Sequence, residues 1–468
     1  MISASVITGA IPNKQSNSEN VQIHKAIYYF CHKNVNKEIL KLAIPNILTN
    51  ITVPILGMVD IYLMGHLDSV YFLGAVALAS AVFNFIYWGF AFLRMSTSGL
   101  AAQTYGREDR QEMALVLQRG LIIAIAGSLM LLILQGPLAD FSFWLLEGSA
   151  EVKEQARRYY FVRIWDAPAA IMLMVIYGWF LGMQNSIYPM VIALAVNIVN
   201  IISSFILVRY FDMNVRGAAL GTVIGQYSGL VLSVFLFHKK YRWVLPLFTR
   251  ELKPLLNKMR HFLHVSGNIF IRTFFIILVF TFFTSKSAGI GDITLAANSV
   301  LLQYLMLFSY FLDGFAYAAE ALVGKFFGAS EKDKLSLAVK NLFKWGLGFA
   351  LAFTLSYALL GETLLSLFTV QGEVIARGKQ YLLWVVMIPL VSFGSYIWDG
   401  IFIGITGSVE MRNSVVISAV IFFFVPFYLL FPVMGNHAMW LSMMLFMASR
   451  SLSLSLFFPK VIKRELKS

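Results

Sequence analysis

The sequence contains little charge. Asp, Glu, Lys and Arg make up 13% of its 468 residues, whereas an ordinary soluble domain carries about 25%. Hydrophobic residues account for 59%, and the mean hydropathy is +0.73. This composition excludes a typical soluble globular domain and favours a protein that crosses a membrane many times.

Cysteine and catalytic motifs are also scarce. The single cysteine, Cys31, excludes an intramolecular disulfide. The sequence has no phosphate-binding P-loop, no HExxH motif, no nucleophile elbow and no Cys/His metal cluster. We therefore expect no cofactor, no metal site and no ATPase activity, so any pumping must draw on an ion gradient or on a partner.

Apolar stretches of about 20 residues, each long enough to cross the hydrocarbon core of a bilayer, recur about a dozen times. They predict an all-α integral membrane protein in contact with lipid. The predicted spans are 37–64, 69–94, 114–136, 157–182, 188–209, 215–238, 257–284, 294–322, 338–360, 379–404, 412–432 and 436–458.

Lys and Arg gather in alternate connecting segments. With both termini in the cytoplasm, the inside segments hold about three times as many of them as the outside segments. The net charge of +13 therefore reflects membrane topology rather than nucleic-acid binding, and we expect a multi-pass protein of the inner (cytoplasmic) membrane. The predicted organisation is a cytoplasmic tail (1–36), an N-lobe (37–238), a cytoplasmic connector (239–256), a C-lobe (257–460) and a C-terminal tail (461–468).

The two lobes are related by an internal repeat. "GLAAQTYGRED" (99–109) aligns with "ALVGKFFGASE" (321–331), and "GWFLGMQNS" (178–186) aligns with "GIFIGITGS" (400–408). Both alignments have the same offset of 222 residues. Because each half has an even number of spans, we expect two six-helix bundles related by an axis along the membrane normal.

Two acids inside the predicted spans have no basic residue three or four positions away. Asp60 lies near the end of the first span, and Asp399 occupies the tenth span at the repeat position that Tyr177 holds in the first half. A carboxylate at bilayer depth costs about 2.5–3.5 kcal/mol, so both acids are candidates for function. Either acid can exchange a proton near neutral pH, or help to bind Na⁺ together with other oxygens.

Polar groups in neighbouring spans could complete a site around Asp60. Asn197 and Asn200 lie three apart on one face of the fifth span, where the alternative role is to hold helices together. Thr222 offers a hydroxyl in the sixth span. Pro45 and Pro54 each remove a backbone hydrogen bond from the first span and predict a kink or hinge there.

The remaining ionisable residues have simpler interpretations. Arg94 and Arg450 lie near predicted span ends, where their side chains can reach the lipid headgroups. Arg163 and Asp166 lie three apart and can neutralise each other. The sequence indicates no function for Asp313 or Glu320.

Several segments together resemble the multidrug and toxic compound extrusion (MATE) transporters. "LAIPNILTNITVPILGMVDIYLMGHL" resembles their first helix. "FIYWGFAFLRMSTSGLAAQTYG", "FLDGFAYAAEALVGKFFG" and "GSYIWDGIFIG" resemble the second, eighth and tenth helices of the DinF-like branch. The resemblance implies a V-shaped molecule with two six-helix lobes, alternating access, and exchange of substrate against H⁺ or Na⁺.

The resemblance also implies roles for individual residues. The first-helix aspartate of the family's N-lobe cation site corresponds to Asp60, its amide and hydroxyl neighbours to Asn200 and Thr222, and the tenth-helix aspartate to Asp399. Many relatives carry an acid where this chain has Ser204, and some carry a seventh-helix glutamate where "NIFIRTFFIILVF" offers Arg272. Losing the second N-lobe acid weakens a Na⁺ site, so H⁺ is the favoured coupling ion.

We therefore predict a monomeric secondary exporter that antiports amphipathic small molecules against H⁺ or, less favoured, Na⁺. The predicted coupling residues are Asp60, Asn200, Thr222 and Asn197, and the predicted substrate-binding residues are Asp399, Tyr177 and Arg272. One alternative is a lipid-linked oligosaccharide flippase, which needs a strongly cationic cavity that only Arg94, Arg163 and Arg272 could supply. A membrane-embedded enzyme is the other alternative, but no motif unites the acids of the spans.

Overall fold

The chain is almost entirely helical in a computed structural model, which describes residues 14–65 and 70–465. Side chains are outside this description for residues 14–33, 53, 55, 56, 60, 61, 70, 252 and 465. Twelve helical spans of the described chain are long and apolar enough to cross a membrane. The predicted all-α membrane fold is confirmed.

In the described chain eight helices precede the connector, and α9, Leu252–Leu256, lies within it. The first eight are α1 (Lys14–Gly65), α2 (Val70–Gly106), α3 (Arg110–Ile133), α4 (Gln135–Leu145), α5 (Ala150–Arg163), α6 (Ala167–Gly182), α7 (Ile187–Arg209) and α8 (Asn214–Tyr241). A 3₁₀ turn, Ile164–Asp166, joins α5 to α6, and the three segments form one span.

Seven helices follow the connector in residues 257–465, the part of the C-terminal half that the structure describes. They are α10 (Met259–Ile290), α11 (Asp292–Gly328), α12 (Lys332–Phe368), α13 (Gly372–Gly404), α14 (Ser408–Ile417), α15 (Val425–Met434) and α16 (Asn436–Glu465). A π-helical segment, Ser418–Phe424, joins α14 to α15 within one span.

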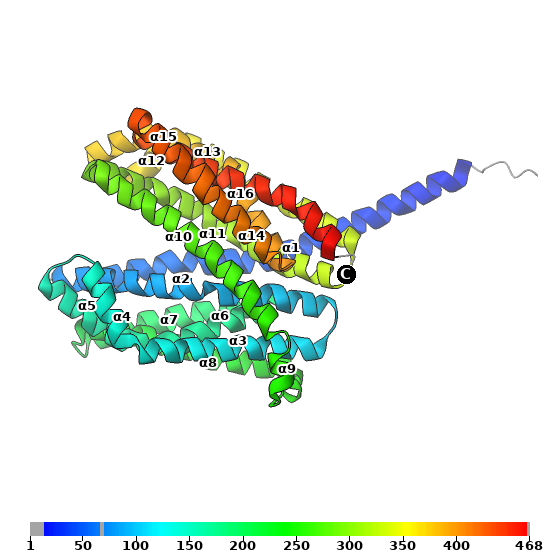
Figure 1. The fold of residues 1–468 in the computed structure, drawn as a ribbon, viewed down its shortest axis with the longest axis horizontal. Coiled ribbons are helices and arrows are strands. Elements are labelled where there is room, and N and C mark those ends of the chain that lie inside the picture. The colour runs from blue at the N-terminus through cyan, green and yellow to red at the C-terminus, as the bar shows by residue number, and fades with distance from the viewer. Residues whose placement is uncertain (1–13, 66–69, 466–468) are drawn as a thin grey trace, which may run out of the picture.

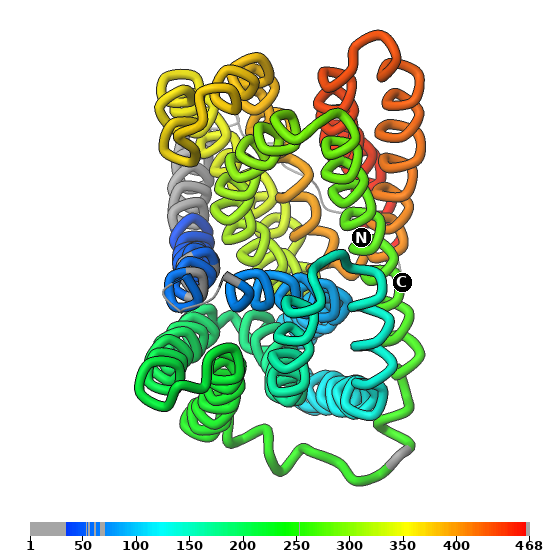
Figure 2. The backbone as a smooth tube through the Cα atoms, turned by 90° about the vertical axis from the view of Figure 1, so that its left-hand side faces the viewer, coloured from blue at the N-terminus to red at the C-terminus, as the bar shows by residue number. Residues whose placement is uncertain are grey.

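The helices form two lobes that diverge as a V (Figure 1). α2–α8 build one lobe and α10–α16 the other, and α1 lies between them. Each lobe has its own hydrophobic core, around Trp179 and Phe180 in the first and around Phe308 and Trp440 in the second. Figure 2, turned by 90°, shows the lobes stacked with the connector running along the edge of the first.

The repeat seen in the sequence is present in the helix packing. Gly178 of α6 packs so closely on α2 that a Cβ atom would overlap the carbonyl oxygen of Arg94, and Gly400 of α13 packs in the same way on Ala316 of α11. Both pairs are related by the offset of 222 residues. The two glycines therefore hold equivalent helix crossings, one in each lobe.

The turns repeat as well. Glu108 and Ser330 have φ angles of 57° and 58°, and Gln184 and Thr406 have φ angles of 60° and 54°. These left-handed residues end equivalent helices 222 positions apart. Backbone conformation has therefore been conserved between the halves where the side chains differ.

The lobes touch at the end that the charge pattern predicts to be cytoplasmic. A Cβ atom at Gly106 would overlap the carbonyl oxygen of Lys325, and one at Gly328 would overlap that of Gln103. Gln103 Nε2 donates to the carbonyl of Gly404 at 2.9 Å, and Gln184 Nε2 donates to that of Ala321 at 2.8 Å. Backbone contact between α2 and α11 closes this end, and the lobes diverge toward the other end (Figure 1).

The first helix of each lobe also packs on the opposite lobe. Ile39 and Leu42 of α1 are buried in the core of the C-lobe, whereas Phe262 of α10 is buried in that of the N-lobe. Pro45 leaves the carbonyl of Lys41 without its helical partner, and Ser186 Oγ donates to that carbonyl at 3.1 Å. Pro45 and Pro54 both lie inside α1, as predicted, and their role as a hinge stays a prediction.

Arg119 holds the connector against the N-lobe. Its guanidinium donates to the carbonyls of Leu255 at 3.0 Å and Pro254 at 2.9 Å, and to Glu112 Oε1 at 2.7 Å. Only 2% of Arg119 is exposed. The connector is therefore attached to the first lobe before the chain enters α10.

Candidate functional site

A cavity of 320 Å³ lies between the lobes, lined by α2, α10, α11, α13 and α16. Its wall combines aromatic and thioether side chains with charged groups. Trp88, Tyr317, Tyr396, Met306 and Met447 supply the apolar surface. Apolar walls with a few placed polar groups are typical of small-molecule sites.

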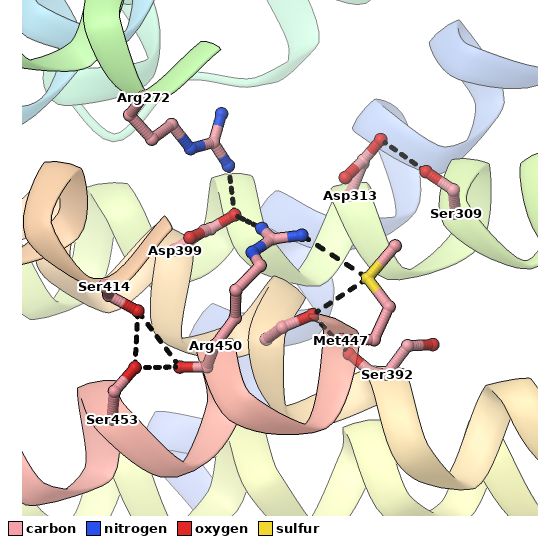
Figure 3. Close-up of polar contacts among 10 residues, drawn as sticks. Arg272, Ser309, Asp313, Ser392, Asp399, Ser414, Met447, Arg450 and Ser453 are labelled. Carbon is pink, nitrogen blue, oxygen red and sulfur yellow. Dashed lines mark hydrogen bonds and ion pairs between the residues drawn. The ribbon is translucent and has the colours of Figure 1, made fainter. Parts of the chain in front are cut away.

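Asp399 is the centre of a charged cluster in this cavity. Its Oδ2 atom accepts hydrogen bonds from Arg272 of α10 and, at 2.6 Å, from Arg450 of α16 (Figure 3). The sequence led us to treat Asp399 as an isolated carboxylate, and that interpretation is wrong. Both partners come from other helices, which the spacing within one helix does not reveal.

Arg450 was expected to reach the lipid headgroups, but it is buried. Only 3% of its surface is exposed, and its guanidinium lies 5.3 Å from the ring centroid of Phe446. Asp399 compensates its charge. The cluster of Arg272, Asp399 and Arg450 carries two positive charges and one negative charge.

Arg94 also departs from its expected position at the headgroups, because it links the two lobes. Its Nη1 and Nη2 atoms contact the two carboxylate oxygens of Glu320 at 3.0 and 3.1 Å. The guanidinium also stacks over Tyr317, 4.1 Å from the ring centroid. This bidentate pair joins α2 to α11 at the wall of the cavity.

Asp313 is the third acid of the cavity. Its Oδ2 atom accepts a hydrogen bond from Ser309 Oγ at 3.2 Å, one turn earlier on α11 (Figure 3). Within the described part of the chain it forms no ion pair. Among the described residues, six charged ones line the cavity, with positive and negative groups equal in number: Arg94, Arg272, Arg450, Asp313, Glu320 and Asp399.

The N-lobe holds a network of neutral polar groups between α7 and α8. Asn200 Nδ2 donates to Thr222 Oγ1 at 3.3 Å, and Ser204 Oγ donates to Asn200 Oδ1 at 3.0 Å. All three side chains are at most 6% exposed. The structure thus brings Asn200 and Thr222 together, as the resemblance implies, and adds Ser204.

Asn197 connects this region to α1. Its Nδ2 atom donates to Thr52 Oγ1 at 2.9 Å, which supports its packing role directly. Asp60 lies on α1 two turns beyond Thr52, and its side chain is outside the described part of the chain.

Two sequence candidates lie apart from the cavity. Tyr177 packs within the core of the N-lobe and is not among the residues that line the cavity. Arg163 and Asp166 form an ion pair with Nε and Oδ2 3.6 Å apart, as their spacing predicts, and Tyr87 donates to the other oxygen of Asp166. Among the described residues, no group of three or more His, Cys, Asp or Glu side chains could hold a metal ion.

A comparison with protein families agrees with this architecture. The family model described as MatE matches residues 45–206 and 269–429, which is most of both lobes. The chain belongs to the MatE family. It is 37% identical over 422 residues to DNA damage-inducible protein F of Escherichia coli (strain K12), covering 90% of this chain and 91% of that protein. The resemblance to the DinF-like branch is confirmed.

More distant MatE relatives are similar over most of the chain. Multidrug and toxin extrusion protein 1 of Danio rerio is 27% identical over 396 residues, covering 80% of this chain and 61% of that protein. The solved structure of the Vibrio cholerae MATE transporter VcmN in the bent form aligns with a TM-score of 0.82 at 18% identity. That alignment covers 93% of this chain and 99% of the other, and it supports the V-shaped MATE fold.

Sequence reasoning did not place Arg450, Glu320 and Asp313 at the cavity of this MATE transporter. Each is an ionisable residue in an apolar helix, which was a visible signal. The partners of Arg450 and Glu320 lie on other helices, so only the packing of the helices shows which charges meet.

Proposed function

We propose that this MATE-family efflux transporter exports amphipathic small molecules by alternating access, in exchange for protons. The observation that carries the proposal is the cavity between two lobes whose contacts seal one end. Gly106 and Gly328 bring α2 and α11 into backbone contact at that end, while the lobes diverge toward the other (Figure 1). Rocking of the two lobes about such a cavity would expose it alternately to each side.

We propose that proton binding in the N-lobe is coupled to substrate export. Asn200, Ser204 and Thr222 provide oxygen and nitrogen groups but no formal charge, and we assign the titratable role to Asp60 of α1. A Na⁺ site needs several formal charges or many oxygens, so a single carboxylate favours H⁺. Protonation of Asp60 would let this network regroup and bend α1 at its prolines.

The proposed substrates are small molecules with apolar and charged parts, because aromatic, methionine and charged side chains share the cavity wall. The balanced charges of the cavity do not match the strongly cationic site that a flippase for pyrophosphate-linked sugars needs. We further propose a monomer in the inner membrane with both termini in the cytoplasm.

Transport by purified protein in proteoliposomes tests the proposal. An imposed pH gradient should drive export of an amphipathic dye, and an imposed Na⁺ gradient without a pH difference should not. Asp60→Asn should abolish gradient-driven export and retain dye binding, because an amide cannot carry the proton. Asp212→Asn is the matched control, since Asp212 is exposed and has a φ of 49°, a conformation that Asn also adopts. Export by Asp60→Asn at the wild-type rate would refute proton coupling through this residue.

A further inference from the structure

Asp313 differs from the other acids of the cavity because no arginine of the described chain pairs with it. Asp399 is shared by Arg272 and Arg450, and Glu320 takes both terminal nitrogens of Arg94. Asp313 Oδ2 accepts from the hydroxyl of Ser309, and among the described residues its Oδ1 atom has no partner at the cavity wall. Asp313 therefore offers a carboxylate that can receive a positively charged group.

The cluster around Asp399 provides the opposite charge. Two guanidiniums share one carboxylate, so the cluster keeps one net positive charge. Arg272 uses Nη2 for Asp399, and its other terminal nitrogen points away from that carboxylate (Figure 3). Arg272 can therefore donate to an acidic group in the cavity without losing its existing partner.

These two features lie in one cavity, and among the described residues that line it the positive and negative charges are equal in number. A ligand with a single positive charge would leave the occupied cavity with one excess positive charge, and an anion would leave one excess negative charge. Uncompensated charge is costly where water is displaced. A ligand with one charge of each sign keeps the balance.

We infer that the cavity selects zwitterionic amphiphiles: a substrate ammonium group binds Asp313, and a substrate carboxylate binds Arg272. The apolar part of the ligand packs against Tyr317, Tyr396 and Met306, which line the same wall. The inference rests on the proposed function, because it names the substrate class of that cavity.

Three matched fluorescent ligands test the inference. Nα-dansyl-lysine carries an ammonium and a carboxylate, dansylcadaverine lacks the carboxylate, and dansylnorleucine lacks the ammonium. The dansyl group reports its transfer into an apolar site, so titration of the purified protein in detergent gives each Kd without a gradient. We expect the zwitterion to bind about tenfold more tightly than either singly charged ligand.

Two substitutions separate the two contacts. Asp313→Asn should weaken binding of the zwitterion and the cation about tenfold and spare the anion. Arg272→Gln should weaken binding of the zwitterion and the anion and spare the cation, while Asp399 keeps Arg450 as its partner. Asp333→Asn, an exposed acid in the first turn of α12, serves as the control and should bind all three ligands as the wild type does.

The inference is overturned if wild-type protein does not bind the zwitterion more tightly than both other ligands, including the case in which it binds none. It is also overturned if Asp313→Asn leaves both amine ligands unaffected. Because binding is measured without a gradient, this outcome is distinct from failure of the proposed antiport. If the protein shows the expected order of affinities but no proton-driven export, the antiport is refuted and the zwitterion site is supported.

Discussion

The two lobes share a backbone plan and differ in the chemistry of their interiors. The hydrogen-bonded polar residues of α7 and α8 in the N-lobe include Asn197, Asn200 and Thr222, and 222 residues later the C-lobe has Ala419, Phe422 and Met444. The charged C-lobe residues of the cavity likewise correspond to uncharged residues in the N-lobe. Asp399, Arg272, Arg450, Asp313 and Glu320 correspond to Tyr177, Asn50, Ser228, Ala91 and Ser98.

This difference shows that the repeat preserved helix crossings and turns, and not the polar groups. Gly178 and Gly400 occupy equivalent crossings, because a Cβ there would push two helices apart whatever the lobe does. Side chains that face a cavity are not restrained in this way. Each lobe could therefore acquire its own task, with neutral polar groups between α7 and α8 in one and the cluster of Arg272, Asp399 and Arg450 in the other.

The largest expected difference between the lobes concerns their central polar groups. Asp399→Ala would leave Arg272 and Arg450 buried without a counter-ion, which should destabilise the protein by about 3–5 kcal/mol. Asn200→Ala in the N-lobe removes neutral hydrogen bonds and should cost about 1 kcal/mol. Thermal unfolding of the two purified variants in detergent measures the contrast.

A combined variant separates charge from packing in the C-lobe. Arg272→Gln/Asp399→Asn/Arg450→Gln keeps polar side chains of similar shape but removes all three charges, so it should recover much of the stability that Asp399→Ala loses. Equal melting temperatures for Asp399→Ala and Asn200→Ala would remove the proposed contrast between the lobes.

The next largest expected effect on stability concerns the ion pair between the lobes, Arg94 and Glu320. Arg94→Glu places two acids together at the cavity wall and should cost about 3 kcal/mol. Combining it with Glu320→Arg restores opposite charges and should recover most of the loss, as measured by thermal unfolding and by dye export.

An exposed ion pair on the N-lobe provides the control for this charge reversal. Arg157 and Asp140 are 2.7 Å apart with 40% and 67% of their side chains exposed, and reversing them should change stability by at most about 1 kcal/mol. A double reversal at positions 94 and 320 that is no more stable than Arg94→Glu alone would show that the pair does not depend on charge.

A smaller loss of stability, from overpacking at the glycine crossings, should be equal in both lobes. Gly178→Ala and Gly400→Ala each insert a methyl group against a neighbouring backbone carbonyl, and each should cost about 1–3 kcal/mol by overpacking. Gly348→Ala, where nothing lies within 4 Å of the new Cβ atom, should instead stabilise its helix by about 0.5–1 kcal/mol. If only one of the two crossings is sensitive in thermal unfolding, the lobes are not equivalent in packing.

The smallest effect concerns the hydrogen bond between Asn197 and Thr52, which has no counterpart at Ala419 in the C-lobe. A double-mutant cycle of Asn197→Ala and Thr52→Val should give a coupling energy of about 0.6 kcal/mol, as is usual for polar pairs between membrane helices. Asn197→Ala should also keep its proton-driven export if its role is packing. Loss of export with unchanged stability would instead place Asn197 in the coupling site.

Much of the scaffold followed from local properties of the sequence. Hydropathy predicted the twelve spans, which depend only on about 20 consecutive side chains matching the bilayer thickness. The glycine spacing predicted the repeat because each half must form the same close crossings. The ion pair between Arg163 and Asp166 was also predictable, since both residues lie within one helical turn.

The charge partners in the cavity could be found only from the tertiary structure. Arg272, Asp399 and Arg450 lie on α10, α13 and α16, and Arg94 meets Glu320 across the two lobes. No spacing along one helix encodes such pairs, because they depend on how far each helix is rotated and shifted against the others. The sequence shows which charges enter the membrane, and the packing of the helices decides which of them are paired and which, like Asp313, stay open to a ligand.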